Sequence, residues 1–348
     1  MINLLFKLII TKQIIFMSGY VKSRIVAIDE VGQRLDHWFN KHFPAIRHGQ
    51  ISKLLRTGQV RVDGKRVKIN CRLILGQTIR VPPLCNNLIY KNNFIKSYQQ
   101  DTKTGNKLIK SILYRDKEII VINKPAGLAV QGGSGLTKHV DGALDSLRFE
   151  ASERPRLVHR LDKHTSGVLI LARQQSSARR LINAFRAKSA VKIYLALVIG
   201  EPKPAIGQIN LPIAKVANKV SEKMMVDYEN GKHALTRYST LEKLSCHITL
   251  VALFPVTGRT HQLRVHMAGI GTPILGDSKY GGVKAFLKGQ LVSKNMHLHA
   301  CAIRIPSYSG DDLEVTAPLR DHMIKSFRFF GVKPERYELP FRFFDHIS

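Results

Sequence analysis

Residues 157–173, LVHRLDKHTSGVLILAR, constrain the fold of this chain more than any other stretch. Val168–Ala172 is a continuous apolar run, which is the pattern of a short strand buried on both faces of a sheet. Just before it, cationic side chains surround one carboxylate, Asp162, and Thr165–Gly167 turns the chain into the strand. A carboxylate held at the mouth of a buried strand by cations is a candidate chemical site. The same residues are also compatible with a basic surface loop in which one Asp neutralises its neighbours.

The charge balance indicates a polyanionic partner. The 348 residues include 55 Lys and Arg against 25 Asp and Glu, which gives a formal net charge of +30 at pH 7. Such an excess disfavours a compact monomer by self-repulsion, so it usually serves an external ligand. We favour nucleic acid over an anionic membrane surface as that ligand. The length allows two domains, one of them with a sizeable core.

The cysteines and the N-terminus bear on the cellular compartment. The chain has four widely spaced cysteines, Cys71, Cys85, Cys246 and Cys301. They form no CxxC pair, which argues against a zinc ribbon or a disulfide framework and fits a reducing compartment. Residues 1–16 are apolar but fall short of the ~20 residues that a membrane span needs. We expect residues 1–19 to be an extension from a mis-assigned start, and the protein to be cytoplasmic and bacterial. A mitochondrial presequence, with the protein in the matrix, is the alternative.

Residues 32–82 have the pattern of a small helical unit with a hairpin. Apolar residues recur on one helical face in two short stretches, and an alternating strand then leads into the tight turn Asp63–Gly64. The expected elements are helices over 34–42 and 47–56 and strands over 59–62, 66–69 and 75–81. Within residues 1–100, 17 Lys and Arg face 4 Asp and Glu, an excess that an ordinary solvated helix pair would not need.

This unit resembles an S4 domain, a small module that grips structured RNA through its helix pair and the following hairpin. We place the domain at residues 20–83. The resemblance implies that RNA is bound by the basic residues of the unit, namely Arg47, Lys53, Arg56, Arg61, Lys65 and Arg66. The module is a binder only and occurs on unrelated proteins, so it does not define the reaction.

The rest of the chain is expected to form a larger domain. Residues 84–110 are polar and typical of an exposed linker. Strand patterns then dominate residues 111–320, with one amphipathic helix near residues 178–185. The tail, residues 321–348, is rich in Phe and basic residues, and we favour docking of these aromatic rings on the core over stacking on RNA.

Three separated segments, residues 159–167, 192–196 and 257–266, place Arg, His or Tyr beside a strand. Asp162 is the one carboxylate at the centre of such a segment, which disfavours a glycosidase of the usual type because that enzyme needs two. A GxSxG elbow of a hydrolase is absent from the sequence. His297, His299 and Cys301 alternate along a strand, but a buried strand is the simpler interpretation, and we predict no metal site.

The motifs and their order resemble those of RluA-type pseudouridine synthases. The segments that carry the resemblance are ILYRDKEIIVINKPAGLAV, HRLDKHTSG with its apolar strand, KIYLALV, PVTGRTHQLRVHM, GDSKYGG and HLHA. QGGSG at residues 131–135 resembles the ribosomal large subunit synthase C branch in particular. The resemblance implies an α+β fold, in which an S4 domain precedes a catalytic domain with a mixed, mostly antiparallel sheet and flanking helices around a central cleft. It further implies isomerisation of uridine to pseudouridine without a metal or an organic cofactor.

Residue chemistry fits that resemblance. Asp162 is the expected essential carboxylate, either as a nucleophile at C1′ or C6 or as the base that opens a glycal route. Arg264 is the cation expected to keep Asp162 ionised against desolvation. Tyr194 offers a ring on which the target base can stack, and Arg160 is expected to fill the gap left by a flipped nucleotide. The alternatives are that Tyr194 only fills the core and that Arg264 only pairs with Asp162 to hold the fold.

Further RNA contacts are expected from His159, Arg259 and His261. We expect 23S ribosomal RNA, or a precursor particle that contains it, to be the substrate of a monomeric enzyme. Two alternatives stay open at this point. One is a non-catalytic S4-type factor for ribosome assembly or RNA binding, and the other is an enzyme of the same family that acts on tRNA.

Overall fold

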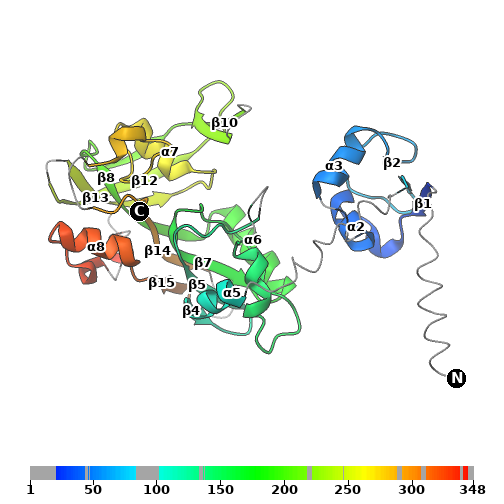
Figure 1. Ribbon diagram of the computed structural model, residues 1–348, viewed down its shortest axis with the longest axis horizontal. Helices are drawn as coiled ribbons and strands as arrows, with labels where there is room; N and C mark the ends of the chain where they lie inside the picture. Colours follow the sequence, from blue (N-terminus) through cyan, green and yellow to red (C-terminus); the bar gives the residue numbers. More distant parts are fainter. Residues whose placement is uncertain are drawn as a thin grey trace. The chain divides into compact units, whose positions relative to one another are not determined.

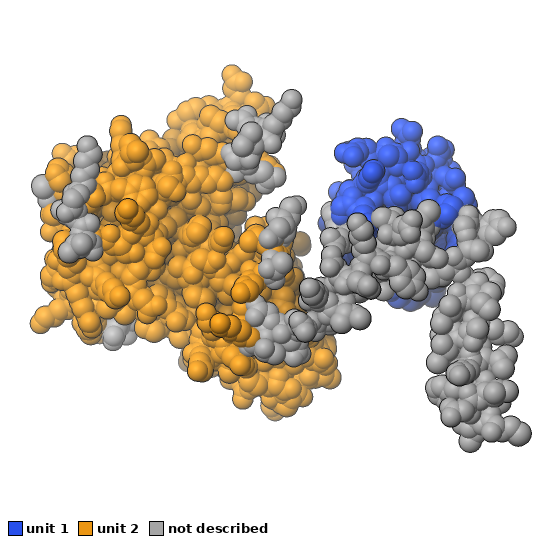
Figure 2. Space-filling view, in the orientation of Figure 1, with its two compact units in different colours: residues 1–99 blue, residues 100–348 orange. Residues whose placement is uncertain are grey.

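The computed structural model forms two compact units, residues 1–99 and residues 100–348 (Figure 2). It describes residues 21–43, 46, 48–83, 102–132, 136, 138–217, 222–245, 247–287, 292–306, 311–337 and 340–343. The expected N-terminal extension, Arg47, Cys85, Cys246, the glycines of residues 133–135 and the first part of the expected linker lie outside the described residues. No helix of the described part has both the length and the apolar character to cross a membrane.

The first unit contains the two predicted helices and a small sheet. Its elements are β1 (Lys22–Ile25), η1 (Ile28–Glu30), α2 (Leu35–His42), α3 (His48–Arg56), β2 (Arg61–Val62) and β3 (Thr78–Val81). The apolar faces of the helices pack together, with Trp38, Phe39 and Ile51 fully buried. The strand order is β1-β3-β2, with antiparallel pairing.

The predicted tight turn is present, but the predicted return strand is not. Asp63 and Gly64 have φ values of 48° and 73°, as a two-residue hairpin turn with positive φ at both positions requires. The strand expected over residues 66–69 is wrong, because the return is limited to a single bridge between Val62 and Lys65. Both residues of β2 pair with β3, through Arg61–Arg80 and Val62–Ile79.

The second unit is built on one ten-stranded sheet (Figure 1). Its main path runs β4 (Ile112–Arg115), β5 (Ile119–Lys124), β7 (Ser166–Ala172), β14 (Leu298–Ile305), β8 (Val191–Ile199), β13 (Ile248–Pro255), β12 (Leu235–Lys243) and β9 (Ile206–Asn210). β6 (Arg156–Leu157) pairs with β7, β15 (Leu313–Thr316) pairs with β14, and β10 (Ile213–Ala217) and β11 (Glu222–Val226) form a separate hairpin. Only β7 and β14 pair in parallel among these strands, so the expected mixed, mostly antiparallel sheet is confirmed.

The predicted buried strand is β7, and all of its residues are buried. Leu169 and Leu171 face one apolar cluster, and Val168, Ile170 and Ala172 face another on the opposite side of the strand. The first cluster includes η3 (Asp141–Leu147) and Leu108 of α5 (Thr102–Ile109). Residues 102–109 of the expected linker are therefore a helix of this unit, because Leu108 is fully buried in that cluster, while Ile109 is exposed.

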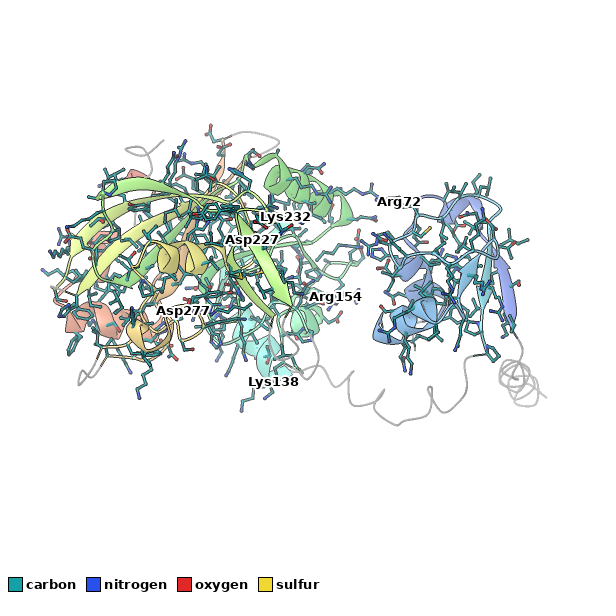
Figure 3. All side chains as sticks on the ribbon, turned by 90° about the horizontal axis from the view of Figure 1, so that it is seen from above. Arg72, Lys138, Arg154, Asp227, Lys232 and Asp277 are labelled. Atoms are coloured by element: carbon teal, nitrogen blue, oxygen red, sulfur yellow. The ribbon has the colours of Figure 1, made fainter. Side chains whose placement is uncertain are left out.

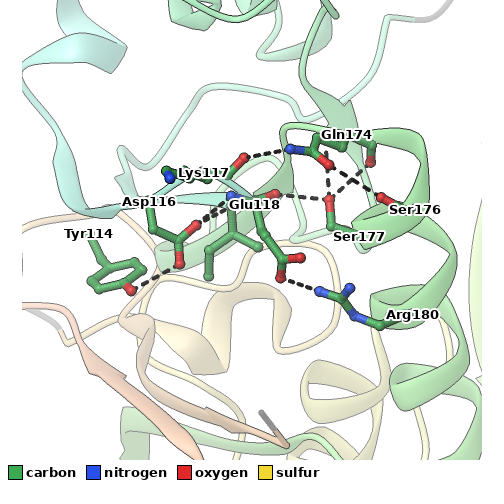
Figure 4. A network of polar contacts seen from close by, with 9 residues as sticks. Tyr114, Asp116, Lys117, Glu118, Gln174, Ser176, Ser177 and Arg180 are labelled. Carbon is green, nitrogen blue, oxygen red and sulfur yellow. Dashed lines mark hydrogen bonds and ion pairs between the residues drawn. The ribbon is translucent and has the colours of Figure 1, made fainter. Parts of the chain in front are cut away.

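Helix α6 (Gln175–Ala187) is tied at its start to the turn between β4 and β5 (Figure 4). The Ser177 hydroxyl donates to the backbone oxygen of Glu118 at 2.9 Å, and Gln174 Nε2 donates to that of Lys117 at 3.2 Å. Arg180 forms an ion pair with the Glu118 side chain. These contacts fix the helix relative to the sheet, so its C-terminal end has a defined position.

Two further helices lie on opposite faces of β8 and β13. Helix α7 (Gln262–Gly269), which the sequence pattern did not predict, places Leu263 and Met267 in the cluster that also contacts Tyr194. Helix α8 (Asp321–Phe329) packs Met323 and Phe327 against the other face. The short helices are η4 (Gly282–Ala285), η5 (Pro334–Tyr337) and η6 (Pro340–Phe343). Tyr337 and Phe341 join Phe327 in that core, so the docking expected for the aromatic tail is confirmed for these rings.

Candidate active site

The loop before β7 is held in place by a close approach of β14. The two strands share only two register positions, Ser166–His299 and Gly167–Ala300. Gly167 has φ 112°, and a Cβ atom there would lie 2.1 Å from the Ala300 carbonyl oxygen, so only glycine fits this position. His299 Nε2 donates to the Ala317 carbonyl at 3.1 Å, and its Nδ1 accepts from the Ser166 hydroxyl at 2.8 Å. The loop that carries Asp162 therefore ends at a position that is fixed by contacts with β14.

Beyond those two positions, β7 no longer pairs with β14, which continues along β8. The free edge of β7 is covered by the chain just before Asp162: Ile170 donates its N–H to His159 Nε2 at 2.9 Å, and Leu157 pairs with Leu171. The His159 ring also stacks on Phe185 of α6 at 4.6 Å between centroids. Burial, with Lys192 nearby, lowers the pKa of His159 to about 3, so this ring is neutral. One ring nitrogen is thus used within the fold, and an RNA contact of His159 stays a prediction.

Lys124, at the end of β5, holds the other side of the same loop. Its fully buried Nζ donates to the backbone oxygens of Pro125 and Leu128, each at 2.9 Å, and of Lys163 at 3.3 Å. Burial lowers the pKa of Lys124 to about 7, while the nearby Asp162 opposes that shift. Three carbonyl acceptors favour the protonated ammonium. This lysine therefore ties the KPAG turn to the residue next to Asp162.

Arg264 is positioned by a carboxylate that is not Asp162. Its Nε and Nη2 donate to the two oxygens of Asp277, each at 2.7 Å, in a bidentate pair. Its remaining amino group, Nη1, lies 3.6 Å from Asp162 Oδ2. Burial alone would lower the pKa of Arg264, but the hydrogen bonds with Asp277 raise it above its ordinary value. Figure 3 labels Asp277, which is only 1% exposed.

Asp277 corrects an expectation from the sequence. Asp162 was expected to be the one carboxylate among the cationic segments, but Asp277 is bonded to the arginine that faces Asp162. Asp277 lies behind Arg264, and its Oδ1 also accepts the backbone N–H groups of Lys279 and Tyr280 at 3.2 and 3.3 Å. It does not line the cavity at Asp162. The two-carboxylate arrangement of a glycosidase stays disfavoured because Asp277 is fully used within the fold.

Tyr280 completes the wall behind Asp162. Its hydroxyl shares a 2.6 Å hydrogen bond with His261 Nδ1, and its ring lies 4.9 Å from the Arg264 guanidinium. The other nitrogen of His261, Nε2, lies 3.9 Å from Asp162 Oδ1. Burial lowers the pKa of His261, although Asp162 opposes the shift. Asp162 thus faces one permanent cation and one titratable ring.

A cavity of about 760 Å³ contains all seven of the predicted site residues of this unit. Asp162 is 24% exposed in it, and Tyr194 from β8 forms part of its wall. Burial raises the pKa of Tyr194, and Asp162 adds to that shift, so the hydroxyl stays protonated. Arg160 is exposed, while Arg259 donates from Nε to the His233 carbonyl at 3.0 Å.

The cavity suits an anionic ligand. Among its described lining residues, Asp162 is the one acid, and six are Lys or Arg, namely Arg160, Arg186, Lys188, Lys192, Arg259 and Arg264. A lining with this excess of positive charge concentrates anions in the cavity. Asp162 is then the one carboxylate of the described lining that can react with a bound ligand. Its size accommodates a nucleotide.

His297, His299 and Cys301 alternate in the sequence as metal ligands on one strand face would, but the structure does not bring them together as a metal site. A bulge between Ala300 and Ala302 interrupts the alternation of β14. His297 Nδ1 donates to the Leu275 carbonyl, and its Nε2 accepts from the Ser326 hydroxyl at 2.7 Å. In the ranges that the structure covers, no three His, Cys, Asp or Glu residues are grouped so that they could hold a metal ion.

The basic residues predicted for RNA binding by the first unit belong to a different compact unit from the residues of this cavity. Lys53 and Arg56 are exposed on α3, and Lys65 and Arg66 are exposed after the hairpin turn. Arg61 is used within the unit, because it donates to the carbonyls of Gly58 and Gly64, each at 3.1 Å.

Comparison with known proteins now identifies the family. Residues 118–269 match the RNA pseudouridylate synthase family. "Ribosomal large subunit pseudouridine synthase C" of Haemophilus influenzae is 39% identical over 313 residues, which span 89% of this chain and 95% of the relative. The protein of the same name from Rickettsia prowazekii is 35% identical over 288 residues, 82% of this chain and 93% of the relative. The chain belongs to the RNA pseudouridylate synthase family.

A solved structure agrees with this membership. Human RNA Pseudouridylate Synthase Domain Containing 4 superposes on the synthase with a TM-score of 0.58 and 29% identity, over 68% of this chain and 98% of that one. The expected RluA-type family and the α+β catalytic fold are therefore confirmed. The family match contains Asp162, Tyr194 and Arg264 but ends before Asp277 and covers none of the first unit.

Four residues of the synthase site were missed by reasoning from the sequence: Lys124, Lys192, Asp277 and Tyr280. Each lies in a motif that the sequence shows, respectively NKPAG, KIYLALV and, for the last two, GDSKYGG. Those motifs marked the segments, but side-chain partners far apart in the chain do not follow from local pattern.

Proposed function

We propose that this synthase isomerises uridine to pseudouridine in large-subunit ribosomal RNA, with Asp162 as the catalytic carboxylate. The observation that carries the proposal is Asp162 itself, the one acid in a cavity of cations, beside Arg264 and a tyrosine wall. The names of the relatives from Haemophilus influenzae and Rickettsia prowazekii support the choice of substrate. A ribosomal substrate is also consistent with the net charge of +30 and with a protein of the bacterial cytoplasm.

The reaction needs one carboxylate rather than two. The N1–C1′ bond of the uridine breaks, the base turns, C5 bonds to C1′, and the proton lost from C5 is balanced by one gained at N1. Asp162 acts as the nucleophile at C1′ or C6, or as the base that opens a glycal route. Arg264 places a cation beside the reacting carboxylate, since its Nη1 lies 3.6 Å from Asp162 Oδ2.

The neighbouring side chains hold the flipped nucleotide. Tyr194 provides a ring face for the uracil, and stacking of this kind contributes about 1–3 kcal/mol per base. Arg160 is exposed and makes no hydrogen bond or ion pair within the described part of the fold, so it is free to enter the RNA stack where the uridine has left. The reaction has no second substrate, and we propose that it proceeds without a metal or an organic cofactor.

We further propose that the first unit is an S4-type RNA-binding domain. Its helix pair and hairpin support this assignment, as do Lys53 and Arg56, which are exposed on the same side of α3 at i and i+3. Its role is affinity for structured RNA, while the second unit performs the chemistry.

An Asp162→Asn variant tests the proposal, with Asp312→Asn as the control at an exposed acid outside the cavity. We expect Asp162→Asn to bind ribosomal RNA with nearly unchanged affinity and to form no pseudouridine, while the control keeps full turnover. Retained turnover in Asp162→Asn would overturn the assignment. Mapping of pseudouridine in total RNA from a deletion strain locates the substrate, because modified positions lost from tRNA instead of 23S RNA contradict the ribosomal assignment. Normal complementation by Asp162→Asn, with no modified base in the bound RNA, would instead indicate a non-catalytic factor.

A further inference from the structure

Lys192 lies on the same face of β8 as Tyr194. Ile193 and Leu195 are buried in the core cluster that includes α8, whereas Lys192 and Tyr194 both line the cavity of Asp162. This alternation is that of a strand, in which residues i and i+2 share a face. Two residues of strand span roughly 7 Å, so the lysine and the tyrosine lie about one nucleoside apart along the cavity wall.

The Lys192 ammonium has no partner among the described residues, which give its Nζ neither a hydrogen bond nor an ion pair. The other buried cations of the site are all satisfied: Arg264 by Asp277, and Lys124 by three carbonyl oxygens. Burial lowers the pKa of Lys192, and no carboxylate opposes this shift. A half-buried cation without a counter-ion costs free energy in the free protein, and that cost is relieved when an anion enters.

The surroundings of Lys192 favour an anion at that end of the cavity. Arg186 and Lys188, at the end of α6, line the same cavity and are exposed. Lys188 is in a left-handed conformation, φ 60°, as the residue that ends the helix. Helix α6 is anchored at its other end by Ser177 and Gln174. The three cations are therefore displayed from a fixed helix and a central strand, not from a loose loop.

We propose that Lys192 binds a backbone phosphate of the RNA beside the flipped uridine. The inference rests on the proposed function and adds to it a second point of attachment. Tyr194 and Asp162 hold the base and the ribose, and Lys192 holds the phosphate about one nucleoside away on the same strand. A phosphodiester is the anion that such a substrate brings into the cavity, and Arg186 and Lys188 continue the cationic path toward the next linkage.

The test uses the full chain in the Asp162→Asn background, so that RNA is bound without turnover. The variants are Lys192→Met, Lys192→Arg and, as a control, Lys325→Met at an exposed lysine of α8. Affinity for an in vitro transcript of large-subunit ribosomal RNA is measured over a salt series, and stability is measured by urea unfolding. We expect Lys192→Met to bind more weakly and to lower the slope of log K against log salt by about 0.7–0.9, the value for one lost phosphate contact. Lys192→Arg keeps the slope, and Lys325→Met changes nothing.

Stability separates a binding role from a structural one. Because the ammonium has no partner in the described fold, Lys192→Met is expected to be as stable as the parent chain or more stable. An unchanged salt slope in Lys192→Met would overturn the inference. A variant that unfolds at clearly lower urea, or fails to fold, would overturn it as well, since either result would assign Lys192 to the fold.

The outcomes also separate this inference from the proposed function. If Asp162→Asn still forms pseudouridine, the catalytic assignment fails, and the salt slope still measures the phosphate contact of Lys192. If Asp162→Asn is inactive and Lys192→Met keeps the slope, the catalytic assignment stands and only the phosphate contact is lost.

Discussion

Arg264 donates two 2.7 Å hydrogen bonds to Asp277, and this buried pair leaves only Nη1 to face Asp162 at 3.6 Å. Asp277 neutralises the buried guanidinium and accepts two of its hydrogen bonds, so the fold does not require Asp162 as a partner of Arg264. Asp162 is consequently 24% exposed and available to a substrate, whereas Asp277 is 1% exposed. The alternative that Arg264 pairs with Asp162 only to hold the fold is disfavoured by this division.

Asp277→Asn is expected to impair catalysis without touching the substrate. The amide cannot accept both hydrogen bonds of the guanidinium, so Arg264 shifts toward Asp162. A displacement of about 1 Å in a catalytic group costs about 10²-fold in rate, and we expect the loss in kcat rather than in KM. Loss of one partner of a buried pair also costs about 3–5 kcal/mol of folding free energy. Steady-state kinetics and urea unfolding measure both effects. Asp227→Asn is the control, at a half-buried turn residue whose amide oxygen can still accept from the backbone N–H groups of Glu229 and Asn230. Unchanged kcat would show that Asp277 does not position Arg264.

Gly167→Ala is expected to destabilise the second unit and to displace the Asp162 loop. The new Cβ atom would lie 2.1 Å from the Ala300 carbonyl oxygen, and φ 112° is unfavourable for any other residue. We expect a loss of at least about 2 kcal/mol, together with a large loss of turnover. Gly271→Ala is the matched control, because Gly271 has φ 80° but open space around its Cβ position. If both variants lose the same stability, the close approach of β14 contributes nothing beyond backbone conformation.

Tyr194→Ala is expected to weaken RNA binding by the stacking contribution, about 1–3 kcal/mol or roughly 5–150-fold in affinity. Tyr194→Phe keeps the ring and is expected to bind RNA as the parent does. Both are measured by fluorescence anisotropy in the Asp162→Asn background. Equal binding by all three proteins would show that the ring only fills the core. Turnover of Tyr194→Phe in the active background reports separately whether the hydroxyl takes part in the chemistry.

Buried neutral histidines make the stability depend on pH. Burial lowers the pKa values of His297 and His299 to about 4 and of His159 to about 3. In the unfolded chain these groups titrate near 6.5, so between pH 6.5 and 4 the unfolded state binds more protons than the folded state. Stability is therefore expected to fall as pH falls through this window, by up to about 1.4 kcal/mol per pH unit for each histidine.

Urea unfolding between pH 5 and 7 tests this dependence. His299→Asn should be less stable than the parent at pH 7, because the Ser166 and Ala317 contacts are weakened, but it should lose less stability on acidification. His247→Asn, at an exposed position, should keep the slope of the parent. Equal slopes in all three proteins would mean that His299 is not held neutral by the fold.

A double variant of the first unit, Lys53→Gln with Arg56→Gln, is expected to lower the affinity for ribosomal RNA. Removal of two phosphate contacts should also reduce the salt slope by about 1.4–1.8. Both residues are exposed on α3, so folding should be unaffected. The matched control is Lys68→Gln with Lys110→Gln, at exposed lysines that are not part of that helix. An unchanged slope in the Lys53–Arg56 variant would show that the charge excess of this unit serves another purpose.

Local pattern was enough for several of the helices and strands and for the one acid among the described residues that line the cavity, Asp162. The helices α2, α3 and α6 and the strands β7 and β8 follow from apolar periodicity, and the Asp63–Gly64 turn follows from its two residues. Pattern failed at α5, where a polar segment contains one buried leucine, Leu108. It also failed at α7, where polar and apolar residues alternate over residues 262–267 as in a strand. In both places burial against the sheet, a property of the whole unit, decides the conformation.

By itself, the sequence determined that a basic, RNA-directed chain carries Asp162 at the mouth of a buried strand. Only the tertiary structure decided what surrounds that carboxylate. Asp277 meets Arg264 across 13 residues of chain, Lys124 reaches the Lys163 carbonyl across 39, and His299 meets Ser166 across 133. Such pairs depend on which strands become neighbours and on how their side chains are directed, and neither is a property of a local segment. The same holds for Lys192, whose lack of a counter-ion among the described residues is visible only once the cavity around it has formed.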